Sequence, residues 1–173
     1  YAVYNEAGNE LTALTKTDAT INGSTTVELQ LTTGNTYSVI FWAAAEDAPY
    51  DVDFGAKTMT VDYDGALSND EARDAFYAYT KFTVNGNKTE SIELKRPFAQ
   101  LNIGASDFEK AGKSGYVPTH SQVTVRNVYS TFNFASGKAG GENEVTFKYA
   151  ELPKATDGSF PVTGNDYLAM NYI

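Results

Sequence analysis

The chain of 173 residues has no cysteine, which excludes disulfide bonds, thiol catalysis and cysteine-bound zinc or iron–sulfur sites. It also has no apolar run near the roughly 20 residues that a membrane-spanning helix requires. Glycine-rich phosphate loops and the G-x-S-x-G nucleophile motif are missing as well. Basic residues are few, 13 against 22 acidic ones, and the net charge of −9 repels the phosphates of nucleic acids. We therefore expect no nucleic-acid partner, no cofactor and no enzymatic activity.

Aromatic residues are abundant instead, with 12 tyrosines and 10 phenylalanines in a chain that is 42% hydrophobic. Such residues fit the pleated, half-buried surface of a sheet. Apolar segments bounded by turn residues predict strands over residues 1–4, 25–32, 36–45, 78–84, 91–103, 122–134, 145–149 and 167–173. About eight to ten strands of this kind indicate an all-β sandwich, in one domain that covers residues 1–173.

The nearly continuous apolar run at 36–45 is typical of a central strand that is buried on both faces. Asn85-Gly86 is a hairpin signal, and Pro97 marks an edge, a bulge or a split in the return strand at 91–103. We expect a glycine-rich loop at 136–143. The predicted core consists of Val27, Leu29, Leu31, Val39, Phe41, Trp42, Leu101, Ile103, Val123, Val125 and Phe147.

An acidic segment interrupts this pattern at about residues 46–74, because residues 43–74 carry nine acidic and two basic side chains. We expect a loop-rich insert with one short helix at 72–76, capped by Ser68 and Glu71 in a capping box. A second helical turn is expected after Ser106 or Asp107, ending at Gly112.

Two carboxylates of the insert, Asp62 and Asp64, precede Gly65 and are weak candidates for a calcium site. The EF-hand pattern fails at its fifth and twelfth positions, which are Ala66 and Arg73. Charge runs of this kind are usually a solvated face, so we predict no metal site.

Other residues in predicted loops are candidates for catalysis or for sugar binding. The four carboxylates Asp51, Asp53, Asp62 and Asp64 offer only a weak acid pair for glycoside hydrolysis. The only histidine, His120, is interpreted as a loop residue bonded to backbone or water. The tyrosines Tyr50, Tyr63 and Tyr116 lie in predicted loops and suggest a carbohydrate-binding module as the alternative function.

Five stretches of the sequence together suggest a family. They are YAVYNEAGNEL at 1–11, YSVIFWAAA at 37–45, IELKRPFAQLNIG at 92–104, VTVRNVYSTFNFASG at 123–137 and YLAMNYI at 167–173. These stretches resemble the fimbrillin and Mfa-like surface proteins of Bacteroides-type bacteria. None of these motifs is catalytic, and their order and spacing together carry the likeness.

The resemblance implies a transthyretin-like β-sandwich, export to the cell surface at the outer membrane, and a role as fimbrial (pilus) subunit or fimbrillin-like lipoprotein. Its implied partners are other pilus subunits, or host or bacterial surface proteins, joined by donor-strand exchange. Membrane contact would come only from a lipid anchor outside residues 1–173. Because both ends of the sequence are strand-like, we expect a piece of a longer, two-domain or lipid-anchored chain.

The last predicted strand is the candidate for pairing with a partner strand. Its residues alternate, so that one face is expected to be more apolar than the other. The candidate pairing residues are Tyr167, Leu168, Ala169, Met170 and Asn171.

The acidic insert gives the first testable prediction, that calcium leaves the melting temperature of the protein nearly unchanged. A specific site saturated at about 100 times its dissociation constant would stabilise the fold by about 2.7 kcal/mol. Thermal unfolding with and without calcium measures the difference. A rise of several degrees that is lost in Asp62→Asn and Asp64→Asn would contradict the prediction and identify a calcium site.

Overall fold

The computed structural model describes residues 1–17, 23–116, 118–152 and 167–173. These residues contain nine strands, one α-helix and one 3-10 turn, which are joined by loops. They are β1 (Ala2–Tyr4), β2 (Thr36–Ala44), β3 (Tyr50–Asp53), β4 (Thr58–Val61), η1 (Glu71–Arg73), β5 (Ala75–Thr83), β6 (Gln100–Gly104), α1 (Phe108–Lys113), β7 (His120–Asn133), β8 (Lys138–Glu151) and β9 (Tyr167–Tyr172).

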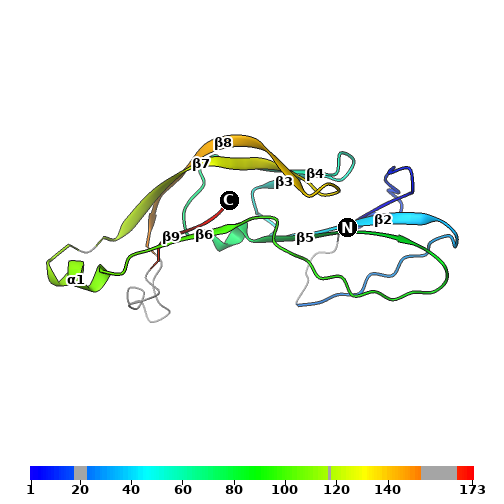
Figure 1. The fold of residues 1–173 in the computed structure, drawn as a ribbon, viewed down its shortest axis with the longest axis horizontal. Coiled ribbons are helices and arrows are strands. Elements are labelled where there is room, and N and C mark those ends of the chain that lie inside the picture. The colour runs from blue at the N-terminus through cyan, green and yellow to red at the C-terminus, as the bar shows by residue number, and fades with distance from the viewer. Residues whose placement is uncertain (18–22, 117, 153–166) are drawn as a thin grey trace.

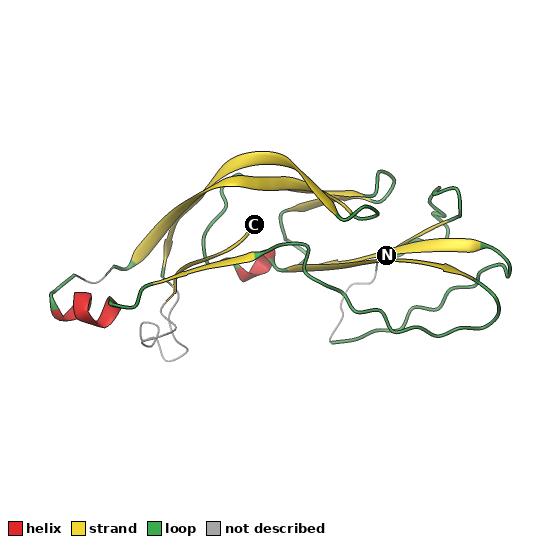
Figure 2. Cartoon of the chain, viewed as in Figure 1, coloured by secondary structure: helices red, strands yellow, loops and turns green. Residues whose placement is uncertain are grey.

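The strands form two layers that face each other (Figure 1). One layer is the four-stranded sheet β3-β4-β7-β8, and the other contains the three-stranded sheet β1-β2-β5 and the two-stranded sheet β6-β9. All strand pairs are antiparallel. Figure 2 shows that helix is confined to two short pieces. The prediction of an all-β sandwich with one or two short helical turns is confirmed.

Strand β2 lies between β1 and β5 and is buried on both faces, as its apolar run predicts. One face contributes Ile40 to the cluster between the two layers. The opposite face contributes Tyr37 and Val39, which pack with Val3 of β1. The three-stranded sheet is therefore covered on both sides, which is why its central strand needs apolar residues at consecutive positions.

The interior between the layers is mainly aromatic. Phe134 lies at its centre and contacts the ring of Trp42 at a centroid distance of 5.6 Å. Trp42 also meets Tyr50 edge to face at 5.4 Å. A second cluster, around Phe147 and Val145, fills the space under the other end of β7 and β8. These contacts hold the two layers together, because burial of apolar surface is the main favourable contribution to folding.

The predicted core is confirmed in full only at Val39 and Phe147, which are buried. The other predicted core residues are half-buried rather than fully enclosed. They are Val27, Leu29, Leu31, Phe41, Trp42, Leu101, Ile103, Val123 and Val125.

Two predicted strands are wrong in whole or in part. Residues 25–32 form no strand, because Leu29 and Leu31 pack against the outer apolar cluster of the three-stranded sheet without joining a ladder. The return strand at 91–103 is reduced to a single bridge at Lys95 and to β6. An alternating pattern reports burial of one side of an extended segment, and ladder formation requires a neighbouring edge in addition.

Two predicted loops are also corrected. Most of the glycine-rich stretch at 136–143 belongs to β8, which begins at Lys138. The acidic insert at 46–74 is not a loop excursion, because it contains β3 and β4. Met59 and Val61 of β4 are buried in the core between the layers.

The two short helices differ in how well the sequence predicts them. Helix α1 lies where it is expected, after Asp107, although it continues past Gly112 to Lys113. The other is only a 3-10 turn, and its cap is Asp70, whose side chain accepts a hydrogen bond from the Ala72 N–H. Ser68 is not the cap, because Asn69 has a φ of 64° and a helix cannot pass through that conformation.

No helix among the described residues has the length and apolar character to cross a membrane.

The packing between the layers predicts that Trp42→Ala destabilises the fold by about 3 kcal/mol, the lower end of the range for a large core aromatic. The half-buried side chain loses its ring contacts with Tyr50 and Phe134. Equilibrium unfolding in urea measures the loss. Tyr116→Ala is the control, since this side chain is 78% exposed and should change stability by under about 0.5 kcal/mol. Equal effects of the two substitutions would contradict the prediction.

Candidate functional site

The predicted pairing residues lie on β9, which pairs with one strand among the described residues. Strand β9 pairs with β6, so that Gln100 lies opposite Tyr172 and Ile103 opposite Ala169. The ladder continues past the strand ends, where Ala99 and Ile173 exchange two backbone hydrogen bonds of 2.9 and 3.0 Å. We use "outer edge of β9" for the edge opposite β6.

Both faces of β9 are buried over residues 169–172, whichever of them is the more apolar. One face looks toward β7 and β8, where Ile173 packs beside the Phe147 cluster. The other face is covered by the 3-10 turn, and the Tyr172 hydroxyl donates a hydrogen bond of 2.9 Å to the Glu71 carboxylate. Strand β9 is therefore a buried strand whose open feature is an edge and not a face.

In the part of the chain that the structure describes, Asn69 is the residue bonded to the outer edge of β9. Its backbone N–H donates to the Met170 carbonyl at 2.8 Å, and its side-chain Oδ1 accepts from the Met170 N–H at 2.8 Å. Asn69 thus pairs with Met170 as a residue of an adjacent strand would. Its Nδ2 also donates to the Glu151 carbonyl at the end of β8, at 2.9 Å. Asn69 therefore connects the two layers of the sandwich.

The segment before Asn69 follows the edge of β8. Lys148 donates its backbone N–H to the Ala66 carbonyl at 2.6 Å, and Leu67 forms a parallel bridge with Lys148. Residues 66–69 therefore close one side of the sandwich between β8 and β9. We call these residues the closing segment.

Arg73 organises the acidic part of the chain from the inside. Its side chain is only 6% exposed, and both terminal nitrogens donate to the Asp62 carbonyl at 3.2 Å. The guanidinium lies 3.5 Å from the Asp70 carboxylate and 5.6 Å from the centre of the Tyr63 ring. A buried charge of this kind is tolerated only with such partners.

The two weak calcium candidates, Asp62 and Asp64, are hydrogen-bonded to each other in a local turn. The Asp62 carboxylate accepts a hydrogen bond of 2.8 Å from the backbone N–H of Asp64, which is an Asx turn. The turn continues into Gly65, which has a φ of 72°. Among the described residues, no group of three or more His, Asp or Glu side chains is placed to hold a metal ion.

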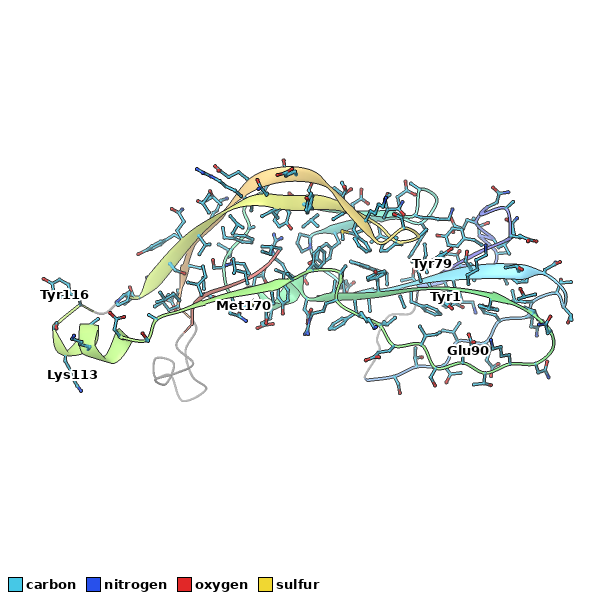
Figure 3. All side chains as sticks on the ribbon, viewed as in Figure 1. Tyr1, Tyr79, Glu90, Lys113, Tyr116 and Met170 are labelled. Carbon is cyan, nitrogen blue, oxygen red and sulfur yellow. The ribbon has the colours of Figure 1, made fainter. Side chains whose placement is uncertain are left out.

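Two of the three predicted loop tyrosines belong to the core rim. Tyr50 stacks on Phe98 at 5.2 Å and donates its hydroxyl to the Arg73 carbonyl, and burial raises its pKa. Burial also raises the pKa of Tyr63 to about 12, and the charge of Arg73 opposes part of this shift. Only Tyr116 is free to meet a ligand, at the tip beyond α1 (Figure 3).

His120 begins β7 and is not part of a catalytic triad among the described residues. Its Nδ1 lies 2.9 Å from the Thr119 hydroxyl, and its ring stacks on Tyr149 at 4.7 Å with an interplanar angle of 7°. Tyr149 itself is 64% exposed. The pair forms a small aromatic surface at the end of the β7–β8 hairpin.

The family of the chain follows from its full-length match to one model. A model described as a family of unknown function, DUF6562, matches residues 1–173. The chain belongs to the DUF6562 family. No curated protein and no solved structure matches it. The resemblance to fimbrillin-like proteins remains a prediction for this DUF6562 domain.

Sequence reasoning missed Asn69 and Arg73, the two residues that hold the closing segment in place. Arg73 had a usable signal, because it is one of only two basic residues among nine acidic ones at 43–74. An isolated cation in an acidic segment is a candidate for a central, paired charge. Asn69 had no such signal, since its partners are more than 80 residues away.

The pairing of Asn69 predicts that Asn69→Ala destabilises the DUF6562 domain by about 2–3 kcal/mol. The substitution leaves the Met170 N–H without its acceptor and forces alanine into a left-handed conformation. Urea unfolding measures the loss.

Asn69→Gly and Asn69→Asp are the matched controls. Glycine adopts the φ of 64° without strain and so loses about 1 kcal/mol less than alanine. Aspartate keeps the acceptor for the Met170 N–H and loses only the bond to Glu151. Equal stability of the wild type and Asn69→Ala would contradict the proposed role of Asn69.

Proposed function

We propose that this DUF6562 domain is a non-enzymatic structural or adhesive protein of the cell surface that joins its partners by strand exchange. The observation that carries the proposal is the outer edge of β9. There, one residue of the chain, Asn69, fills a position that a whole strand can occupy. A partner strand that replaces Asn69 would extend the sheet through backbone hydrogen bonds, which is β-augmentation.

The backbone of β9 supports this proposal. Alternate residues of an antiparallel strand present their N–H and C=O groups to opposite edges. Because Ile173 is bonded to the β6 side, Tyr172 and Met170 present theirs to the outer edge. Met170 is bonded to Asn69, whereas the Tyr172 backbone has no partner on that edge among the described residues.

A buried side chain gives a second, independent support. Asn171 is 2% exposed, and its amide has no hydrogen-bond partner in the described part of the chain. A strand added at the outer edge of β9 would place its own side chains beside Asn171 on the interior face. Buried amides are nearly always paired, so a polar residue of the added strand would meet an existing need.

The non-enzymatic part of the proposal rests on how the polar side chains are used. Asp62 caps a turn, Arg73 is buried against the Asp62 carbonyl, and His120 stacks on Tyr149. These contacts are those of a scaffold. Asp51 and Asp62 line a common surface cavity, and the Asp62 carboxylate there is engaged by the backbone N–H of Asp64. The fimbrillin-like motifs favour pilus subunits or other surface proteins as partners, and outer-membrane attachment through a lipid anchor elsewhere in the protein.

Glycan binding is the second candidate function, and it is favoured by the exposed ring of Tyr149 on His120. Such a flat aromatic surface can stack on a sugar ring. A glycan array would detect it as micromolar binding that Tyr149→Ala abolishes. That result, without any strand-dependent assembly, would replace the proposal of strand exchange by that of a carbohydrate-binding module.

The test of strand exchange compares Tyr172→Pro with Tyr172→Phe in the full-length protein on its native cells. Proline removes the N–H that points to the outer edge of β9, while the ladder with β6 uses other residues. Phenylalanine keeps this N–H and loses only the hydroxyl contacts with Glu71 and Gln100. Surface labelling of intact cells and cross-linked ladders of multimers are measured.

We expect the wild type to be labelled on intact cells and to form a ladder. Tyr172→Phe should keep the ladder, and Tyr172→Pro should lose it while the purified variant still unfolds cooperatively. A folded Tyr172→Pro variant that keeps the ladder, or a protein that is inaccessible on intact cells, would overturn the proposal.

A further inference from the structure

The edge of β5 that lies opposite β2 presents unpaired backbone groups. Even-numbered residues of β5 bond toward β2, as the hydrogen bond of 3.0 Å from the Val84 N–H to the Asn35 carbonyl shows just beyond its end. The odd-numbered residues Tyr79, Lys81 and Thr83 therefore point their N–H and C=O groups to the outer edge. No residue in the described part of the chain pairs with these groups.

One pair of hydrogen bonds already fixes a register on this edge. Tyr77 and Lys95 bond to each other through both backbone groups, at 2.9 Å each, as an isolated antiparallel bridge. Each step toward Thr83 on β5 corresponds to one step back from Lys95 on the other segment. Continued in this register, the ladder pairs Tyr79 with Glu93, Lys81 with Ser91, and Thr83 with Thr89.

Residues 88–94 lie apart from the edge that this register assigns to them. They have no strand or bridge assignment and run through a long loop that leaves β5, on which Glu90 is labelled (Figure 3). Ile92 is 38% exposed there, although it belongs to an alternating apolar pattern with Leu94. An exposed alternating segment next to an open edge is an unstable combination in water.

The side chains match in the register set by Tyr77 and Lys95. Ile92 falls opposite Thr80 and Leu94 opposite Ala78, on the face where Phe82 and Val39 already form an apolar cluster. Closure would therefore bury the exposed Ile92.

Charge and loop length agree with the same register. Lys81 lies opposite Ser91 and diagonal to Glu93, a favourable pair of opposite charges. The connection between Thr83 and Thr89 is five residues long and contains Asn85-Gly86, and Gly86 has a φ of 142°. Five residues with such a pair are sufficient for a hairpin loop.

We propose that residues 88–94 are a strap that closes onto the outer edge of β5 in the register of the Tyr77–Lys95 bridge. In the closed state the strap occupies this edge, and in the open state of the structure Tyr79, Lys81 and Thr83 are available for strand addition. Closure would extend the bridge at Lys95 into a strand over residues 89–95 that pairs with β5, and the bend at residues 97–98 would separate this strand from β6, which pairs with β9. The strap does not depend on the proposed function, because it closes whether or not β9 recruits a partner.

A cysteine pair tests the closed strap directly, since the native chain has no cysteine. Thr80→Cys and Ile92→Cys form a non-hydrogen-bonded pair in the proposed register, with Cα atoms about 4.5 Å apart, within disulfide range. Under mild oxidation we expect an intramolecular disulfide in most molecules. The matched control Thr80→Cys with Ser91→Cys is one residue out of register, and its disulfide should form at least tenfold more slowly.

Hydrogen exchange of the native backbone provides a second readout that needs no cysteine. Ser91→Pro removes an N–H that the closed strap donates to Lys81, and Ser91→Ala keeps it. We expect the amides of Tyr79, Lys81 and Thr83 to exchange at least tenfold faster in Ser91→Pro than in Ser91→Ala.

Three outcomes would overturn the strap. They are equal disulfide formation in the two cysteine pairs, a disulfide found only between two molecules, and equal exchange rates in the two Ser91 variants. A folded Tyr172→Pro variant that keeps the ladder of multimers would overturn the proposed function and leave all three readouts unchanged, so the strap and the proposed function can fail separately.

Discussion

The need of buried backbone groups for hydrogen-bond partners determines how the second layer of this sandwich is built. Its three-stranded and two-stranded sheets are joined by no common ladder, so their edges must be satisfied one at a time. At β9 the partner is Asn69, and at β5 it is Lys95, each through a pair of hydrogen bonds to one residue. These edges therefore determine where the segments that contain Asn69 and Lys95 lie.

The acidic segment illustrates the same requirement in side chains. Its negative charge does not form a ligand site but surrounds one buried cation, Arg73, which bonds to the Asp62 carbonyl. Removal of Arg73 from water is acceptable because carbonyl, carboxylate and aromatic partners replace the lost hydration. The result is a fixed connection between β4 and β5 that holds Asn69 at the edge of β9. The charged side chains of the acidic segment therefore hold its backbone in position.

The outer edges of β9 and β5 lie in the same layer but differ in their surroundings. Strand β9 is buried on both faces, so a strand added at its outer edge would contribute to the core. The outer edge of β5 lies beside exposed residues such as Tyr79 and is matched by a segment of the same chain. An unprotected edge invites aggregation, so the proposed strand exchange would require such control.

The sequence by itself determined the fold class, the central strand β2 and the helix after Asp107, because period and composition report burial and local backbone preference. It also determined that the last residues form a strand. It did not determine which extended segments find a neighbour. Residues 25–32 and 91–94 alternate as well as β7 does, yet only β7 meets partner edges along its length.

Tertiary structure alone decided the role of Asn69. Its partners are close only after the layers have assembled, because its side-chain bonds to Glu151 and Met170 span 82 and 101 residues of sequence. A local pattern carries no information about such distant pairing, because Asn69 binds the Glu151 carbonyl and the Met170 N–H, which are backbone groups that nearly every residue type carries. Which strand edges find a partner is therefore decided by the assembled sheets, whereas the tendency to form a strand follows from the order of the side chains.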